Sequence, residues 1–263
     1  EIGVRLVGSE MCIRDRDWEY KYQNRIGKPF GSYGSVQPFG LKALGLFASQ
    51  EEIDNSPKQT YGEYRVGDIR YQDINGDGVI DSQDEVALGY TNMPEIVYGF
   101  GATAQWKNWD FNVFFQGVAH TSFFLAGASL RSPFSSGSME RSAVNEDIYG
   151  NVWMSTNTPE QNDRAIYPRL SLSNQAGSSN NNQTSDWWLR DGSFLRLKNF
   201  EIGYTLPKKL LGKNFIRSLR FYVAANNLLT FCNFKLWDPE KGSSDGSGYP
   251  LNRVVTLGFN INL

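Results

Sequence analysis

The sequence contains one histidine and two cysteines among 263 residues, and both shortages remove whole classes of site. A single imidazole, that of His120, cannot build a multi-histidine metal site, and most hydrolase triads need an imidazole beside a nucleophile. Cys12 and Cys232 are too few for a disulfide framework in a chain of this length and show no metal-type spacing. We therefore predict that the protein is not an enzyme.

The chain also lacks any long apolar run and any excess of one charge. No run of about 18 apolar residues is present, so the sequence predicts no transmembrane helix. Lys and Arg number 26 against 28 Asp and Glu, and the formal net charge of -2 creates no field that attracts nucleic acid. We therefore predict no nucleic-acid partner.

Aromatic residues are plentiful for a chain that is polar on average. Phe, Tyr and Trp make up 14% of the residues although the mean hydropathy is -0.45. This combination favours β structure, in which aromatic side chains are enriched. It also suits a transmembrane barrel, because each strand of a barrel wall shows only about 10 residues of alternating polarity.

The first residues carry charges throughout and show no apolar core of a signal peptide. The stretch LVGSEMCIRDR, which begins at Leu6, resembles a translated sequencing-adapter read-through. We expect residues 1–16 to be a non-native leader, so that the natural sequence runs over 17–263 from Asp17 onward and Cys12 has no role.

Several segments alternate apolar and polar residues with the period of a β-strand. Lys107 and Asn108 separate the first two, which predicts a hairpin with Trp106 and Trp109 beside its turn, as in the aromatic girdle of a membrane barrel. Simple alternation puts Arg196 on the apolar face of its strand, together with Lys198, and we expect both to lie beyond the bilayer. The predicted strands cover residues 96–106, 109–116, 194–206, 219–226 and 254–263.

The connections between these strands are alternately short and long. Residues 107–108 and 207–217 form the short ones, and the second includes a possible helical turn after Pro207. Residues 118–191 and 230–252 form the long ones, and we expect 118–191 to be an extended loop with little regular structure. Outer-membrane barrels show this asymmetry, with short periplasmic turns and long extracellular loops, which places the end of the chain in the periplasm.

A calcium-type loop spans residues 73–84, DINGDGVIDSQD. Oxygen-bearing residues recur at positions 1, 3, 5 and 9 of the loop, and Gly78 stands at position 6, where an EF-hand loop turns sharply. Position 12 carries an aspartate instead of glutamate, so we expect a structural calcium ion bound less tightly than in a sensor; the alternative is a solvated turn. The predicted ligands are Asp73, Asn75, Asp77, Val79 through its carbonyl, Asp81 and Asp84.

Taken together, several stretches resemble the C-terminal portion of SusC/RagA-like TonB-dependent outer-membrane transporters. The resemblance covers about residues 27–263. It is carried by GLKALGLFASQEEIDNSP from Gly40, GDIRYQDINGDGVIDSQDE from Gly67, PEIVYGFGATAQWKNWDFNVFFQG from Pro94, SDWWLRDGSFLRLKNFEIGYTLPKKLL from Ser185 and LRFYVAANNLLTF from Leu219.

The resemblance implies an all-β fold, the antiparallel C-terminal part of a transmembrane barrel of about 22 strands with long extracellular loops. It implies a place in the cell outer membrane, in contact with lipid. The plug domain and the segment that contacts TonB would lie in a missing N-terminal part. A SusD-like surface lipoprotein is the implied partner, and glycans or peptides are the implied substrates.

Aromatic residues of the two long connections are candidates for contact with a ligand or with the lipoprotein lid, because aromatic rings stack on sugars. The alternative is that they pack the loops together. These candidates are Trp153, Trp187, Trp188, Trp237 and Tyr249.

Two other functions stay open. A soluble extracellular β-domain that binds glycans and is braced by calcium would share the strands and the loop. A glycosidase would need two converging carboxylates. The sequence offers Glu95, Asp110, Glu140 and Glu201 but pairs none of them, and Asp110 and Glu201 fall on polar strand faces that suit a hydrated lumen.

Overall fold

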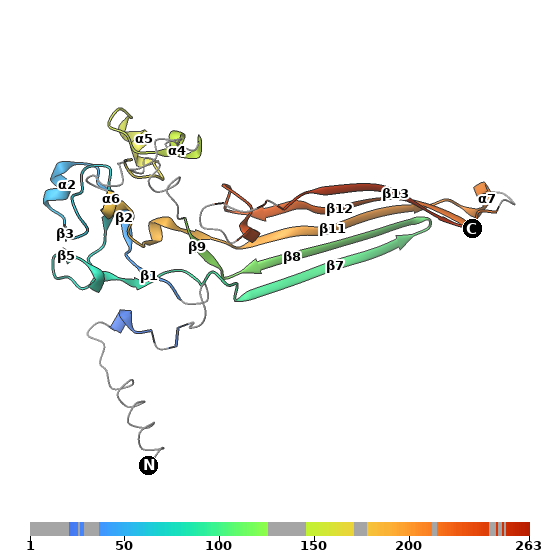
Figure 1. The fold of residues 1–263 in the computed structure, drawn as a ribbon, viewed down its shortest axis with the longest axis horizontal. Coiled ribbons are helices and arrows are strands. Elements are labelled where there is room, and N and C mark those ends of the chain that lie inside the picture. The colour runs from blue at the N-terminus through green and yellow to red at the C-terminus, as the bar shows by residue number, and fades with distance from the viewer. Residues whose placement is uncertain are drawn as a thin grey trace, which may run out of the picture. The chain divides into compact units, whose positions relative to one another are not determined.

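The structure is a computed structural model that describes residues 21–25, 27–28, 37–125, 146–170, 178–211, 215–241, 246, 249 and 251–263 (Figure 1). The predicted leader at 1–16 lies outside the described residues. The chain divides into two compact units, one formed by Glu1–Gly89 with Phe124–Leu189 and the other by Tyr90–Phe123 with Arg190–Leu263. None of the helices in the described ranges has the length and hydropathy needed to span a bilayer.

The second unit is built on one antiparallel sheet of five long strands (Figure 1). The strand order is β13-β12-β11-β8-β7, and all neighbouring strands pair in antiparallel fashion, with a register shift only where β11 meets its two neighbours. The five predicted strands are therefore confirmed. Their bounds are β7 (Ile96–Trp106), β8 (Trp109–Ala119), β11 (Phe194–Thr205), β12 (Ser218–Cys232) and β13 (Val254–Asn262).

The connections at one end of this sheet are short, as predicted. The turn between β7 and β8 contains only Lys107 and Asn108, and Lys107 takes a positive φ of 55°, which a two-residue hairpin turn requires. The connection between β11 and β12 includes α7 (Lys208–Leu211), a single helical turn after Pro207. At the other end, η5 (Pro239–Lys241) lies in the long connection after β12.

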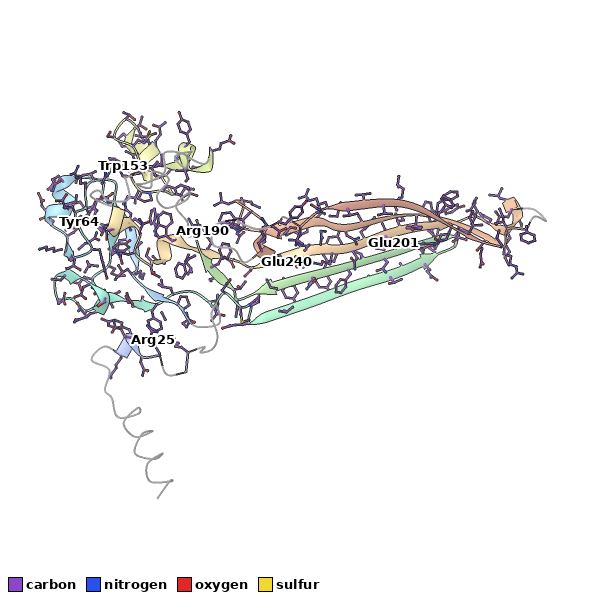
Figure 2. All side chains as sticks on the ribbon, viewed as in Figure 1. Arg25, Tyr64, Trp153, Arg190, Glu201 and Glu240 are labelled. Carbon is purple, nitrogen blue, oxygen red and sulfur yellow. The ribbon has the colours of Figure 1, made fainter. Side chains whose placement is uncertain are left out.

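The two faces of the sheet differ in chemistry, because residues directly opposite each other in the register share a face. One face pairs Phe100 with Phe115, whose ring centroids are 5.2 Å apart, and continues to Leu257, which is 79% exposed. The other face pairs Asn112 with Glu201, which Figure 2 labels, and also carries Asp110 and Gln116. The alternation expected of a barrel wall is present in all five strands, with one interruption in β11.

The prediction for Arg196 is wrong. The register of β11 shifts between Leu197 and Asn199 against both neighbouring strands, so Lys198 is an extra residue in a β-bulge. One inserted residue reverses the alternation on its far side. Arg196 therefore lies opposite Gln116 on the polar face, not on the apolar face.

The first unit consists of short elements around a compact core. Three two-stranded sheets pair β1 with β6, β2 with β4, and β3 with β5, the last in parallel. Phe47, Ile69 and Ile80 are fully buried in this core. The elements are η1 (Lys21–Gln23), β1 (Phe39–Gly40), β2 (Ala43–Leu46), α2 (Gln50–Asp54), β3 (Lys58–Gln59), β4 (Ile69–Tyr71), β5 (Val79–Ile80), η2 (Ser82–Asp84), β6 (Val86–Ala87), α4 (Glu146–Asn151), α5 (Pro159–Asp163), α6 (Ser178–Asn181) and η4 (Asp186–Trp188), with β9 (Ser122–Phe124) and β10 (Leu189–Asp191) where the chain passes between units.

The segment 118–191 contains more regular structure than predicted. Its described part holds α4, α5, α6 and η4, and short strands at both ends. Polar residues that favour loops act here as helix caps: the Thr158 side chain accepts from the Gln161 backbone N–H, and the Gln161 side chain accepts from the Thr158 backbone N–H. A composition rich in Asn and Ser therefore did not mean an absence of helices.

Candidate functional site

The predicted calcium loop forms a tight turn held by its own side chains. Asp73 accepts hydrogen bonds from the backbone N–H groups of Gly76 and Gly78 at 2.6 and 2.8 Å. Asn75 accepts from the Asp77 N–H at 3.0 Å, and Asp77 accepts from the Val79 N–H at 2.8 Å. Gly76 and Gly78 take positive φ values of 79° and 84°, which glycine adopts without strain.

Asp84, at the last position of the loop, is fully buried. Its carboxylate accepts backbone N–H groups from Ile74 at 2.8 Å, Asn75 at 3.3 Å and Asp81 at 2.9 Å. Asp81 in turn caps η2 by accepting the Gln83 N–H at 2.7 Å. The end of the loop is thus fastened to its beginning, a structural role that the ligand prediction did not include.

The described residues contain no cluster of three His, Cys, Asp or Glu side chains arranged to hold a metal ion. The loop does create a negative field. Burial, followed by the nearby carboxylates of Glu85, Asp81 and Asp84, raises the pKa of Tyr61 to about 12. A cation in the loop would lie in this field, and calcium binding stays a prediction.

The loop aromatics differ widely in exposure. Trp188 is fully buried, and its indole Nε1 donates to the Asn181 carbonyl at 2.7 Å. The ring centroids of Trp188 and Tyr167 are 6.4 Å apart. These contacts favour a packing role for Trp188. Trp237 is half-buried against Phe234, with ring centroids 4.8 Å apart, and Tyr249 is 85% exposed. Trp187 is also half-buried. For all five residues, ligand contact stays a prediction.

Trp153 is the candidate that lines a cavity. The cavity has a volume of about 820 Å³ and lies within the first unit. Gly67, with a φ of 89°, lies against the Trp153 indole, and any Cβ there would overlap the ring. The lining also includes Gln50, Arg65, Tyr149, Met154 and Arg169.

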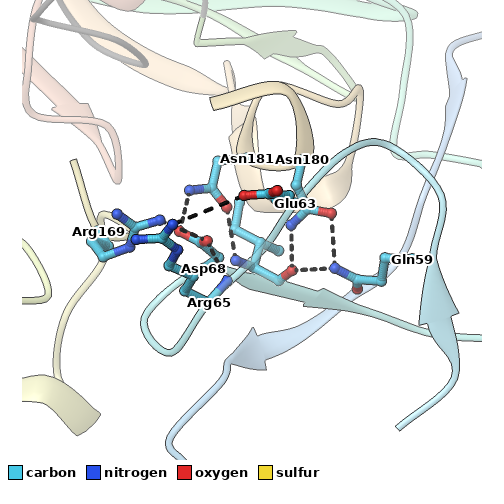
Figure 3. A network of polar contacts seen from close by, with 8 residues as sticks. Gln59, Glu63, Arg65, Asp68, Arg169, Asn180 and Asn181 are labelled. Atoms are coloured by element: carbon cyan, nitrogen blue, oxygen red, sulfur yellow. Dashed lines mark hydrogen bonds and ion pairs between the residues drawn. The ribbon is translucent and has the colours of Figure 1, made fainter. Parts of the chain in front are cut away.

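Arg169, which lines this cavity, also belongs to a buried polar network (Figure 3). Its centre is Asp68, which has no exposed side-chain surface and accepts from Arg169 Nη2 at 3.0 Å, from the Arg65 backbone N–H at 2.8 Å and from Asn181 Nδ2 at 2.9 Å. Asn181 also accepts the Ile69 N–H at 2.9 Å. Neighbouring Asn180 accepts from Gln59 Nε2 at 2.8 Å. The network therefore ties α6 to β3 and β4.

On the polar face of the long sheet, Arg220 joins three strands. Its Nε donates to Asp110 Oδ1 of β8 at 3.0 Å, and its Nη2 contacts Asp110 Oδ2 and lies 2.5 Å from Glu201 Oε1 of β11. Asp110 and Glu201, two of the four carboxylates considered for a glycosidase, are thus brought together by one shared cation. The strand alternation in the sequence had already put both of them on polar faces.

A second arginine anchors a loop at the other end of that face. Arg196 is 2% exposed; its Nη2 lies 2.5 Å from Asp238 Oδ1 and its Nε lies 3.2 Å from Glu240 Oε2. Lys198 adds an ion pair with Glu240 at 3.2 Å. This cluster was missed because the bulge at Lys198 conceals the true face of Arg196. Of the other glycosidase candidates, Glu95 contacts His120 Nδ1 at 3.2 Å, and Glu140 lies outside the described residues.

Comparison with known proteins identifies the family. No protein-family model matches the chain. The TonB-dependent receptor P26 of Formosa agariphila is 33% identical over 236 residues, which cover 84% of this chain and 22% of that receptor. The TonB-dependent receptor SusC of Bacteroides thetaiotaomicron is 22% identical over 261 residues, which cover 98% of this chain and 23% of SusC. The chain belongs with the SusC-like TonB-dependent receptors. It spans 22% to 23% of the length of these two curated relatives.

Solved structures show the same fold for this SusC-like chain. A chain of the RagAB peptide importer in its open-open state superposes with a TM-score of 0.59 at 20% identity, covering 89% of this chain and 24% of that chain. The closed-closed state gives a TM-score of 0.58 at 22% identity, covering 86% and 23%. The fold is thus part of a TonB-dependent barrel, as predicted.

Proposed function

We propose that this SusC-like chain forms part of the barrel wall of an outer-membrane transporter. The observation that carries the proposal is the five-stranded sheet with one apolar and one polar face. Apolar side chains that are 48% to 79% exposed, such as Phe221, Leu257 and Phe259, suit contact with lipid. The polar face, with its Arg220 cluster, suits a hydrated lumen.

We base the proposed transport cycle on the relatives that this chain resembles. The substrate is a glycan or a peptide, captured with a SusD-like surface lipoprotein, and import is energised through TonB, which contacts a part of the receptor outside this sequence. SusC and three TonB-dependent receptors of Formosa agariphila support the TonB link, and the RagAB peptide importer supports import of a polymer. Transport, not catalysis, is the proposed activity, since the paired carboxylates share Arg220.

Cysteine labelling of β13 tests the barrel wall within one strand. Leu257 and Thr256 are neighbours on opposite faces of β13. In cells that make the full receptor without Cys12 and Cys232, we expect Thr256→Cys to react with a water-soluble maleimide and Leu257→Cys to be protected by lipid. The rival function, a soluble glycan-binding domain braced by calcium, predicts rapid labelling of Leu257→Cys and a protein that is soluble without detergent.

We further propose that the loop at 73–84 holds a structural calcium ion. The support is the spacing of its oxygen-bearing residues and the negative field that acts on Tyr61. Titration of the receptor with calcium in a calorimeter should give heat that Asp77→Ala abolishes. Asp54→Ala, a change of equal charge in α2, is the control and should leave the heat intact. Absence of calcium heat in the unaltered receptor would contradict the proposal.

Among the loop aromatics, Trp153 is our proposed ligand contact, because its indole lines the 820 Å³ cavity and is positioned by Gly67. Trp153→Ala should raise the substrate concentration needed for half-maximal uptake while surface expression stays normal. Trp106→Ala is the matched control, since Trp106 lies beside the β7–β8 turn and does not line the cavity. Joint substitution of Trp187 and Trp188 tests whether they too serve uptake, and unaltered uptake there would reject contact by that pair.

A further inference from the structure

The short connections lie at one end of the long sheet (Figure 1), and their sequence is rich in basic and apolar residues. Four cations there are exposed, and we call them the basic rim: Lys107, Lys208, Lys209 and Arg217. Exposed apolar side chains stand among them, including Leu210 at 71% and Phe215 at 82% exposure. Such a mixture is unfavourable in water alone and is typical of segments at a membrane interface.

The acidic residues of β8 and β11 do not pair with the cations of the rim. Asp110 and Glu201 both contact Arg220. Within the described part of the chain, no residue of the basic rim forms a salt bridge. The rim therefore presents positive charge that a partner from outside the sheet can match.

The rim is continuous with the apolar face. The Lys107 Nζ lies 4.6 Å from the centroid of the Trp106 ring, and Trp106 is itself 67% exposed at the end of β7. Its cross-strand partner Trp109 is 47% exposed. Indole rings prefer the boundary between hydrocarbon and headgroups. The ammonium group of Lys107 is thus held at the depth of lipid phosphates when the apolar face contacts acyl chains.

We propose that the basic rim binds the headgroups of anionic phospholipids in the leaflet that contacts the short connections. This inference rests on the proposed barrel wall. Charge complementarity selects the occupant: the phosphates of an anionic lipid match the four cations, while its acyl chains cover Leu210, Phe215 and the apolar strand residues. A protein partner would match the charge but would leave no role for the continuity with the lipid-facing strands.

Lipid titration of the detergent-solubilised receptor, followed by native mass spectrometry, tests the inference. Phosphatidylglycerol should bind more tightly than phosphatidylcholine, and the preference should fall as salt is raised. The double variant Lys208→Gln, Lys209→Gln should weaken phosphatidylglycerol binding roughly fivefold for each charge removed and leave phosphatidylcholine binding unchanged. Lys198→Gln with Lys235→Gln removes the same charge at the opposite end of the sheet and should have no such effect.

Three results would overturn the inference. Equal affinity for both lipids, or an equal loss in the control pair, would show that the rim does not select anionic headgroups. Displacement of phosphatidylglycerol by inorganic phosphate would assign the site to the free ion. If labelling at Thr256 and Leu257 supports a membrane barrel but the receptor shows no lipid preference, only the lipid-binding inference fails. If the protein is soluble without detergent, the proposed barrel wall fails as well.

Discussion

The guanidinium of Arg220 lies directly over Gly203, so a side chain that leaves β12 crosses β11 to reach β8. The register explains the path, because Gly203 stands opposite Asp110 on one side and opposite Tyr222 on the other. A Cβ at position 203 would overlap the guanidinium. Glycine is therefore needed here for close approach and not for an unusual backbone angle.

Gly203→Ala should displace Arg220 and lower the free energy of unfolding by about 1 kcal/mol, the upper range for ion pairs that water reaches. Denaturant unfolding of the receptor in detergent measures the change. The effect should vanish when Arg220 is already replaced by alanine, since the two positions act through one contact. Gly150→Ala, where added Cβ atoms meet nothing within 4 Å, should leave this contact unaffected. An equal penalty with and without Arg220 would show that the glycine acts differently.

Arg196→Met should be far more costly than a change at Lys198. The Arg196 side chain is 2% exposed, and its loss leaves Asp238 and Glu240 without their buried cation, which typically costs about 3–5 kcal/mol. Lys198→Met removes a 29% exposed partner of Glu240 and should cost less than about 1 kcal/mol. Limited proteolysis after β12 gives a second measurement: faster cleavage of Arg196→Met alone supports an anchor, and equal rates contradict it.

The sequence predicted the long sheet well because its information is local. Alternation in β7, β8 and β13 is unbroken, and each strand reveals its two faces without knowledge of its neighbours. The family resemblance then supplied the architecture that five strands alone do not specify. Comparison with the TonB-dependent receptors confirmed both steps.

The errors arose where long-range contacts decide local structure. The bulge at Lys198 becomes visible only when β11 is paired with β8 and β12. Burial of Asn181 depends on Asp68 and Ile69, more than a hundred positions earlier in the chain. Alternation within one segment carries no information about either. Trp188 likewise reads as a loop aromatic, although its indole N–H is satisfied within the core.

Asn181→Ala should destabilise the first unit by about 1–3 kcal/mol for each buried group that loses its partner. The Ile69 N–H and one oxygen of Asp68 both lose a hydrogen bond in this variant. Asn233→Ala, at an exposed position after β12, is the surface control. Thermal unfolding monitored by tryptophan fluorescence compares them, and equal midpoints would mean that the network adds no stability.

The pH dependence of Tyr61 connects the calcium loop to a measurement that needs no substrate. Its pKa of about 12 in the folded protein exceeds the ordinary value of 10.0, through burial first and then Glu85, Asp81 and Asp84. Between these values the folded state keeps a proton that the unfolded state has lost. The resulting stabilisation is complete below about pH 10 and is lost as the pH rises through about 12. Tyr61→Phe should lack this loss, and a comparison of unfolding free energies across that range measures it.

Calcium should shift the titration of Tyr61, because a bound dication opposes the field of Asp81 and Asp84 at the phenol. The difference in phenolate absorbance between the unaltered receptor and Tyr61→Phe isolates this one tyrosine among 13. With calcium present, the midpoint should move to lower pH, and magnesium at the same ionic strength should move it less, since Mg²⁺ demands stricter geometry. Asp77→Ala should abolish the shift of the Tyr61 midpoint that calcium causes, because Asp77 acts on Tyr61 only through the bound ion. If calcium does not change the titration midpoint of Tyr61 in the unaltered receptor, the loop does not bind calcium there. It is then a self-capped turn, stabilised by Asp73 and Asp84 alone.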